Sequence, residues 1–519
     1  MNEGAQLTLT PGTVMKFRNS TDELWVNGTL IADASGTGDT PIVFTSYIDD
    51  AVGGDTNDDG SATSPAANDW SSIRFTPSSS GSVLDNVIVR YGGNWYNENI
   101  HVATRAVTLR NSTISHSGEY GIQFENTLPA SLTNLRFENN GLAAAYADLE
   151  NNADSVVLSG NSGVGNQYNG LQVDGTITGT VTWDGDDAFP FLVNGDLTVN
   201  EGAQLTLTPG TVMKFRNSTD ELWVNGTLIA DASGTGDTPI VFTSYIDDAV
   251  GGDTNDDGSA TSPAANDWSS IRLSAGSRGS VLDNVIVRYG GNWFAEQIYI
   301  NTSGALLRNS VSSFSGDRGL TVEGAAPQIY ANQFVQNRDG VGFGAGATGW
   351  ITNSVILQNS EEGVYVTGGA APTLRNNAIF GNGNYGVQHV DNSTVTDAVD
   401  NYWGSPSGPR HTTTNPSATG DRVSDYVKYT PWQPAPKNGL LTGDLLFVAV
   451  GRAASAQGSA QPTTCPTPTS PHEPSKAPWL CWCCPLAPNT STAPTAASTG
   501  PRSIKLSGNW ATCHRAKAA

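Results

Sequence analysis

Cysteine is absent from residues 1–439, and the whole chain of 519 residues has only three methionines. Charged residues make up only 14% of the chain, whereas 58 residues are glycine. Because glycine in a helix interior costs about 1 kcal/mol relative to alanine, this composition excludes an all-helical bundle or a coiled coil. The five cysteines lie between residues 465 and 513, in an arrangement that fits neither a disulfide framework nor paired zinc knuckles.

Basic residues are also scarce, at 26 against 49 acidic ones, which gives a net charge of −23. This balance argues against nucleic acid or an anionic membrane as partner. Residues 440–519 hold six basic and two acidic side chains, so the acidity belongs to the rest of the chain. We therefore expect a boundary near residue 436 and an irregular tail at residues 437–519, which is either a Pro/Thr-rich linker or the product of a frameshift. The longest apolar stretch, residues 440–451, is too short and interrupted for a membrane span.

Two long repeats organise the remainder. Residues 2–74 recur without change as residues 200–272, and residues 81–95 return as residues 279–293. We expect a first long unit at residues 1–198 and a second at residues 199–436. Because Met1 stands where the second copy has Val199, we expect the chain to begin inside a longer array, which explains the lack of a signal peptide in residues 1–20.

A shorter period lies within the second unit. Asparagines and glycines recur every 21–23 residues, and apolar residues follow each glycine at the first and third positions. The series are Asn309, Asn332, Asn353 and Asn376, then Gly319, Gly340, Gly363 and Gly386. Segments of four to eight alternating residues predict short strands, and helical solenoids need longer repeats. The sequence therefore predicts an all-β parallel solenoid with 21–23-residue coils and loop insertions. In it, asparagine and glycine serve the turns.

Particular phrases strengthen this prediction. The opening GAQLTLTPGTVMKF, the segment NDWSSIRF followed by SVLDNVIVRYGG, and residues 401–409 and 423–432 carry a family likeness. Over residues 1–436 the chain resembles secreted bacterial and archaeal right-handed parallel β-helix proteins of the pectate-lyase-like superfamily. The resemblance implies a right-handed β-helix with a closing coil at residues 401–432 and a secreted or cell-surface location. It implies no particular reaction.

An acidic segment at residues 49–60, repeated at residues 247–258, has the D-x-N-x-D-G start of a calcium loop. Oxygen ligands at alternate positions can wrap a hard cation. The candidate ligands are Asp55, Asn57 and Asp59, with Asp253, Asn255 and Asp257 in the second copy. Ala66 stands where an EF-hand has glutamate, so Asp49, Asp50 or Asp69 would have to complete the site. The alternative interpretation is a solvated acidic loop without metal.

Repeated tryptophans suggest a second kind of site. The candidates for stacking on sugar rings are Trp25, Trp70 and Trp95, with Trp223, Trp268 and Trp293 in the second copy. Equivalent platforms would suit multivalent binding to polysaccharide or cell-surface glycans. The alternative interpretation is that these side chains cover coil corners and loop bases.

No catalytic residue is assigned from the sequence. Motifs of zinc proteases, serine hydrolases and nucleotide-binding proteins are absent. Coils at residues 300–400 carry few carboxylates (Glu323, Asp339, Glu361 and Glu362), with no evident cluster. We therefore expect a non-enzymatic extracellular scaffold or adhesin, with structural calcium as the only expected cofactor. The alternative is a carbohydrate-active enzyme, a polysaccharide lyase or glycoside hydrolase.

Overall fold

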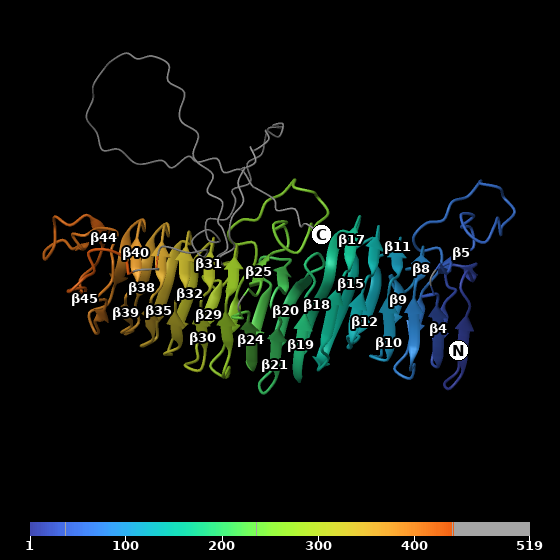
Figure 1. Cartoon of the computed structure of the whole chain (residues 1–519), viewed down its shortest axis with the longest axis horizontal. Helices are drawn as coiled ribbons and strands as arrows, with labels where there is room; N and C mark the ends of the chain where they lie inside the picture. The colour runs from blue at the N-terminus through green and yellow to red at the C-terminus, as the bar shows by residue number, and fades with distance from the viewer. Residues whose placement is uncertain (37, 235, 438–439, 441–519) are drawn as a thin grey trace, which may run out of the picture. The chain divides into compact units, whose positions relative to one another are not determined.

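The computed structural model describes residues 1–36, 38–234, 236–437 and 440. The contacts divide the chain into two units, Met1–Ala453 and Ala454–Ala519, and the described residues all belong to the first. Every regular element in these residues is a β-strand, and the strands stack in parallel ladders (Figure 1). The prediction of an all-β parallel solenoid is confirmed.

Each coil contributes strands to three ladders, which form three faces of the solenoid. The first face contains β1 (Gln6–Leu9), β4 (Thr29–Asp33), β7 (Ser82–Asp85), β10 (Val107–Arg110), β13 (Ser131–Thr133), β16 (Val156–Ser159), β19 (Thr180–Asp184), β21 (Gln204–Leu207), β24 (Thr227–Asp231), β27 (Val281–Asp283), β30 (Leu306–Arg308), β33 (Gln328–Tyr330), β36 (Trp350–Thr352), β39 (Thr373–Arg375), β42 (Thr396–Asp397) and β45 (Val427–Lys428).

The second face contains β2 (Val14–Phe17), β5 (Ile42–Ser46), β8 (Val87–Arg90), β11 (Thr113–Ser115), β14 (Arg136–Glu138) and β17 (Ser162–Val164), then β22 (Val212–Phe215), β25 (Ile240–Ser244), β28 (Val285–Arg288), β31 (Val311–Ser313), β34 (Gln333–Val335), β37 (Val355–Leu357) and β40 (Ala378–Phe380). The third face contains β3 (Leu24–Val26), β6 (Ile73–Phe75), β9 (Glu98–Val102), β12 (Tyr120–Glu125), β15 (Ala143–Asn152), β18 (Tyr168–Ile177), β20 (Phe191–Val199), β23 (Glu221–Val224), β26 (Ile271–Leu273), β29 (Ile298–Ile300), β32 (Arg318–Glu323), β35 (Asp339–Gly344), β38 (Glu362–Val366) and β41 (Tyr385–His389).

The strand register gives the length of each coil. Leu306 pairs with Gln328, Gln328 with Trp350 and Trp350 with Thr373, so these coils contain 22, 22 and 23 residues. Coils in the first half are longer where loops extend them; Leu132, for example, pairs with Leu158. Equivalent residues thus lie about 4.8 Å apart along the stack, the spacing of neighbouring strands.

Apolar side chains fill the interior because alternate residues of each strand point inward. The two predicted apolar positions after each glycine are buried, including Val341 and Phe343 of β35. The glycines themselves lie within strands rather than in turns, which corrects the expected turn geometry. A Cβ on Gly340 would lie 2.5 Å from the carbonyl oxygen of Gly363 on the next coil, so glycine is required there by close packing between coils.

The asparagine series combines two different positions. Asn309, Asn353 and Asn376 have left-handed backbones, with φ of 49°, 51° and 57°, as expected for turn residues. Asn332 belongs to the neighbouring position, because Ala331 occupies the left-handed turn of its coil, with φ of 58°. The predicted turn role is therefore confirmed for three of the four residues.

Asn332 is part of a buried polar ladder. Its Oδ1 accepts a hydrogen bond from the backbone amide of Ser310 at 3.0 Å, and its backbone amide donates to Ser354 Oγ at 3.1 Å. The ladder continues to Asn377 and Asn401, where each Oδ1 accepts an amide from the preceding coil at 2.9 Å. These bonds satisfy backbone groups at a corner that water cannot reach.

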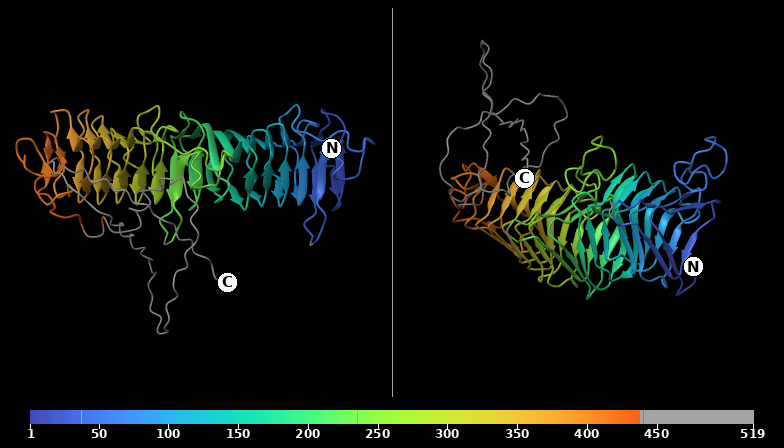
Figure 2. Two further views of the ribbon diagram at one scale, coloured as in Figure 1. Left: turned by 90° about the horizontal axis from the view of Figure 1, so that it is seen from above. Right: turned by 45° about the vertical axis from the view of Figure 1, so that its right-hand side comes forward.

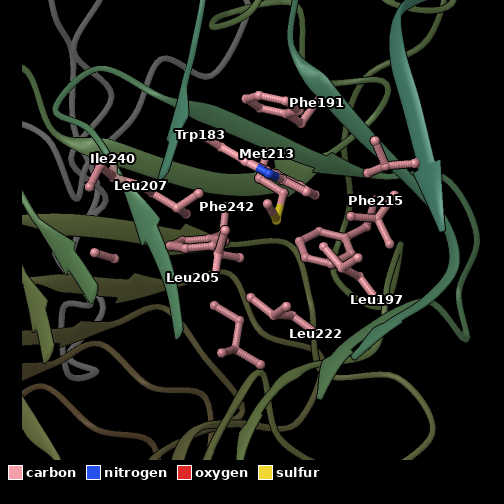
Figure 3. Packing of buried hydrophobic residues seen from close by; sticks show 14 of the residues in the cluster. Trp183, Phe191, Leu197, Leu205, Leu207, Met213, Phe215, Leu222, Ile240 and Phe242 are labelled. Atoms are coloured by element: carbon pink, nitrogen blue, oxygen red, sulfur yellow. The ribbon is translucent and has the colours of Figure 1, made fainter. Parts of the chain in front are cut away.

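The two predicted long units form one continuous stack. Strand β20 joins them: Phe191–Val193 pairs with β22 on the second face, while Asp196–Val199 pairs with β23 on the third. Figure 3 shows the apolar side chains that meet in the interior at this junction, including Trp183 and Phe191.

Residues 401–432 form the last coil of the stack, as the sequence led us to expect. Trp403 is fully buried, Asn401 ends the polar ladder, and β45 pairs with β42 as the last strand of the first face. Of the predicted tail, residues 438–439 and 441–519 lie outside the described residues. Among the described residues there is no helix with the length and apolarity needed to cross a membrane.

Candidate functional site

Two equivalent corners of the solenoid bring together aromatic side chains and an arginine. Each combines side chains of third-face strands with the segment where the second face turns into the third, just before β9 in the first copy and before β29 in the second. We define the first aromatic corner as Trp25, Arg74, Trp95 and Tyr96. The second aromatic corner is Trp223, Arg272, Trp293, Phe294 and Tyr299.

The predicted tryptophans differ in their exposure to solvent. Trp70 and Trp268 are completely buried, each ring stacked on a phenylalanine (Phe17 or Phe215) at 4.1 Å between centroids. Trp70 Nε1 also donates a hydrogen bond to the Arg90 carbonyl at 2.9 Å. These two residues are core, so their predicted role as binding platforms is wrong.

Trp95 and Trp293, by contrast, are exposed to solvent. Their side chains are 74% and 72% exposed, more than any other large apolar side chain of the described residues. Both have left-handed backbones, with φ of 68° and 61°. A left-handed bulky residue is strained by about 1–3 kcal/mol, and such strain clusters at ligand-binding positions.

The remaining aromatic residues hold the arginine of each corner. The guanidinium carbon of Arg74 lies 5.5 Å from the Trp25 ring and 3.8 Å from the Tyr96 ring. In the second corner, Arg272 lies 5.2 Å from the ring of Trp223 and 4.1 Å from each ring of Phe294 and Tyr299. Trp25 is 40% exposed and Trp223 is half-buried. In each corner the aromatic rings thus pack around the arginine and hold its guanidinium group in place.

Buried glutamates lie behind these arginines. Arg74 Nη1 pairs with Glu98 Oε1 at 3.1 Å, and Arg272 pairs in the same way with Glu296. Burial raises the pKa of Glu296 to about 7, against the opposing effect of Arg272. Burial likewise raises the pKa of Glu221 to about 7, although Ser269 Oγ donates to its Oε1 at 3.1 Å.

The acidic loops are the second candidate site. We use this name for residues 49–69 and 247–267, which project from the side of the stack (Figure 1). In the first loop, carboxylate oxygens of Asp50, Asp55 and Asp59 all lie within 4.8 Å of one another. Asp248, Asp253 and Asp257 form the same cluster in the second loop. Three carboxylates in this space have the oxygen chemistry that calcium prefers.

Only some of the predicted calcium ligands converge in the structure. Asp50 completes the cluster, while Asp49 instead accepts a hydrogen bond from Arg90 Nε at 2.8 Å. Asn57 turns its amide nitrogen toward Asp59 Oδ2 at 2.7 Å, and its buried Oδ1 has no hydrogen-bond partner in the described residues. Asn255 has the same arrangement in the second loop.

A lysine fastens each acidic loop to its coil. Lys214 Nζ donates to the carbonyl of Gly252 at 2.8 Å and to Thr254 Oγ1 at 2.7 Å, and Lys16 makes the equivalent contacts in the first loop. Lys214 is fully buried, and burial lowers its pKa to about 8. Burial and the nearby Asp253 carboxylate raise the pKa of Asp248 to about 6.

Backbone bonds join each loop to the adjacent aromatic corner. The amides of Asn68 and Asp69 donate to the carbonyls of Gly92 and Tyr91, at 2.9 and 3.0 Å. The second copy repeats both bonds, 198 residues later. The end of each acidic loop is therefore hydrogen-bonded to the segment that directly precedes the exposed tryptophan of the same copy.

A third cluster appears where the sequence indicated none. Carboxylate oxygens of Asp339 in β35, Glu362 in β38 and Glu361, which directly precedes β38, lie within 4.8 Å of one another. Burial, followed by the Asp339 carboxylate, raises the pKa of Glu362 to about 7. Arg318 and Arg338 pair with Asp339 at 3.5 and 3.4 Å.

The glycine series contained a signal for this cluster. Asp339 and Glu362 each stand directly before a glycine of that series, so they occupy equivalent positions on neighbouring coils. Sequence reasoning used the residues after each glycine and overlooked the one before it.

Comparison with known proteins supports the architecture. Residues 266–402 match the family model of the right handed beta helix region. Together with the stacked parallel strands, this match makes the chain a right-handed parallel β-helix protein, consistent with the pectate-lyase-like superfamily that its sequence resembles. Searches of curated proteins and of solved structures found no match to the chain.

Proposed function

We propose that this protein is a non-enzymatic extracellular or cell-surface scaffold that binds polysaccharide at its two aromatic corners. The observation that carries the proposal is the pair of exposed, left-handed tryptophans, Trp95 and Trp293, at equivalent corners of one stack. Apolar faces of sugar rings stack on exposed tryptophan, and these two side chains are the most exposed large apolar ones of the described residues.

The spacing of the corners favours a polymeric ligand. Seven coil steps separate β9 from β29 on the third face, so the two corners lie about 34 Å apart along the stack at 4.8 Å per step. A polysaccharide that reaches both corners gains avidity because the second contact is intramolecular. Two similar sites on one stack therefore suit attachment to a surface polymer, whereas a single catalytic centre gains nothing from the duplication.

A glycan array identifies the ligand, and titration calorimetry then measures binding of its polymeric and short forms. We expect Trp95→Ala or Trp293→Ala to weaken binding of the polymer at least tenfold and to halve the stoichiometry for the short oligosaccharide. Trp350→Ala is the matched control, since Trp350 is 59% exposed on β36 of the first face. If the two corner variants bind the polymer as tightly as the control does, the proposal is wrong.

We also propose that each acidic loop binds one calcium ion, through Asp50, Asp55 and Asp59 and through Asp248, Asp253 and Asp257. Support comes from the convergence of three carboxylates in each loop and from Asp50, which completes the incomplete D-x-N-x-D-G pattern. The ion would offset repulsion between these carboxylates and hold the loop base next to the aromatic corner. Its role is structural.

Hydrogen exchange with and without calcium tests this assignment. Calcium should slow exchange of amides in residues 49–69 and 247–267, and a chelator should reverse the effect. Asp55→Asn should abolish protection of the first loop while leaving the second unchanged. Asp58→Asn is the control, because Asp58 is exposed and lies outside the cluster. Equal protection in both variants would contradict the assignment.

One observation favours the alternative of a carbohydrate-active enzyme. Burial raises the pKa of Glu362 to about 7, and this residue lies beside the Asp339 carboxylate; two neighbouring carboxyl groups are the usual catalytic pair of glycoside hydrolysis. The contacts of Arg318 and Arg338 with Asp339 make a structural ion network the simpler interpretation.

Assays of bond cleavage on polyuronates and neutral glycans, with and without chelator, separate the two functions. The scaffold proposal expects no new reducing ends and no unsaturated products. Cleavage by the wild-type chain that Asp339→Asn and Glu362→Gln both abolish would establish the enzyme instead. Glu323→Gln is the control, because Glu323 lies on the same face outside the cluster.

A further inference from the structure

The outer side of the second face is apolar in the second unit. Strands β28, β31, β34, β37 and β40 pair one after another and stack without a break, in the yellow-green to orange part of the chain (Figure 2). Ile356, in the middle of β37, belongs to the interior apolar cluster, whereas its neighbours Val355 and Leu357 belong to a separate one. Because successive side chains of a strand point to opposite sides of a sheet, this separate cluster lies on the outer side. We define the outer apolar patch as Val311, Val335, Val355 and Leu357.

The first unit has a polar surface at the same place. Thr113 of β11 occupies the position of Val311, 198 residues earlier in the sequence. Its ladder continues through Arg136 and Ser162, and both of these residues are exposed. Val164, on the outer side of β17, is 50% exposed. The outer apolar patch is therefore a property of the second unit and not of the duplicated architecture.

The outer apolar patch is shielded from solvent. Its three valines are at most 3% exposed, and Leu357 is 8% exposed. Ile286, Phe380 and Leu440 pack against it. The first two belong to the second face itself, whereas Leu440 follows the closing coil in the sequence. A contiguous apolar surface on the outside of a fold marks an interaction site, and Leu440 shows which part of the chain reaches this one.

The chain after the closing coil returns along the stack toward the outer apolar patch. Gln433 Nε2 donates a hydrogen bond to Asn376 Oδ1 at 3.0 Å, and Lys437 Nζ donates to Asn353 Oδ1 at 2.8 Å. Asn376 and Asn353 are the turn residues between the first and second faces of two successive coils. The chain thus moves back by one coil between residues 433 and 437, and Leu440 then lies against the second face.

The segment that begins at Leu440 is the longest apolar stretch of the chain. Residues 440–451 read LLTGDLLFVAVG, with one charged side chain, Asp444. The outer apolar patch extends over two coil steps, from β37 to β31, which is about 10 Å at 4.8 Å per step. A few extended residues cover this distance at about 3.3 Å each, so the segment is long enough to cover the whole patch.

We propose that residues 440–451, of which 441–451 lie outside the described residues, dock on the outer apolar patch of the second face. The segment is the favoured occupant because Leu440 already contacts the patch, which makes the remaining contacts intramolecular. Residues 440–451 are then part of the solenoid, and they keep its apolar surface from associating with other chains. The inference does not rest on the proposed function, since the aromatic corners involve the third face.

Carbene footprinting of the full-length chain, read by mass spectrometry, tests the docking because it labels exposed side chains of every type. In the wild-type chain we expect Val355 and Leu357 to be labelled about fivefold less than Val164. Leu445→Asp combined with Phe447→Asp should raise labelling of the patch about fivefold, since a carboxylate disfavours apolar contact. Leu486→Asp, which lies after the segment, is the matched control and should leave the labelling as in wild type.

Two further measurements make the result specific. Ile356 should stay unlabelled in every variant, which shows that the stack remains folded; if it is labelled, Leu445→Ala with Phe447→Ala replaces the aspartate variant. Labelling at several protein concentrations, with sedimentation velocity, distinguishes the chain's own segment from a second copy. The proposal is overturned if the wild-type patch is labelled as strongly as Val164, if its protection is unchanged by the substitutions in the segment, or if protection appears only at concentrations at which the chain dimerises.

Discussion

A comparison of Leu24 with Leu222 measures how much the coil that contains β20 contributes to the stability of the coil that follows it. They occupy the same position of identical 73-residue blocks, and both pair with the same kind of neighbour, Ile73 and Ile271. Only Leu222 also pairs with Leu197 of β20, and it is 0% exposed. Replacing each by alanine therefore changes the same atoms in two different environments.

The expected losses follow from burial. Truncation of a fully buried leucine costs about 2–5 kcal/mol, through lost transfer free energy and the cavity that remains. Since Leu222 is enclosed on both sides, we expect Leu222→Ala to cost about 3 kcal/mol. Leu24 is only partly buried, so we expect Leu24→Ala to cost about 1 kcal/mol.

Native-state hydrogen exchange is the appropriate assay because a long solenoid opens locally rather than in one step. The quantity to compare is the opening free energy of the amides in β3 and β23, in wild type and in each variant. Equal losses of opening free energy in the two variants would refute the argument that the preceding coil, rather than the local sequence, sets the stability of this block.

Three further predictions concern charge and packing. Folding raises the pKa of Glu221 from 4.5 to about 7, so the folded chain favours the protonated carboxyl group. The local free energy of unfolding should therefore fall by up to about 3 kcal/mol as the pH rises from 4.5 to about 7. Glu221→Gln should remove this dependence, as measured by exchange of β23 amides at pH 5 and pH 8. If the second loop binds calcium, protonation of Asp248, whose pKa is about 6, should weaken calcium binding about tenfold between pH 7 and pH 5. Titration calorimetry in an Asp55→Asn variant, in which only the second loop binds, measures this change. An affinity that does not depend on pH would contradict the prediction. Gly340→Ala should lower the opening free energy of the β35 amides by about 2 kcal/mol or more in native-state hydrogen exchange, since its Cβ would lie 2.5 Å from Gly363 O. Gly344→Ala, whose Cβ would have its nearest atom at 3.4 Å, should lower it less.

The solenoid itself was predictable from the period of the sequence. Alternating apolar residues after Gly340 and Gly363 correctly indicated short inward-facing strands, since alternation reflects the geometry of a single strand. The register was less secure, because Ala331 takes the left-handed turn of its coil while Asn332 joins the buried ladder, and the sequence alone does not distinguish these adjacent positions.

The candidate sites were predictable only in part. The acidic loop was evident from its pattern, but the choice of Asp50 over Asp49 depends on where Arg90 of a neighbouring coil lies. Trp70 and Trp95 are equally repeated in the sequence, yet one is core and the other is the most exposed large apolar side chain of its copy. Repetition alone therefore cannot distinguish a structural aromatic residue from a binding one.

The sequence by itself determined that the chain folds into stacked parallel coils, that one block with an acidic loop and two tryptophans appears twice, and that a third tryptophan follows each copy in a second, shorter repeat. These properties are local, since periodicity and turn residues act within a coil. Only the tertiary structure decided which tryptophans face solvent, which carboxylates converge, and why Leu24 and Leu222 differ in burial. The reason is that burial and electrostatic environment depend on neighbouring coils, and identical sequences have different neighbours at the edge and in the middle of the stack.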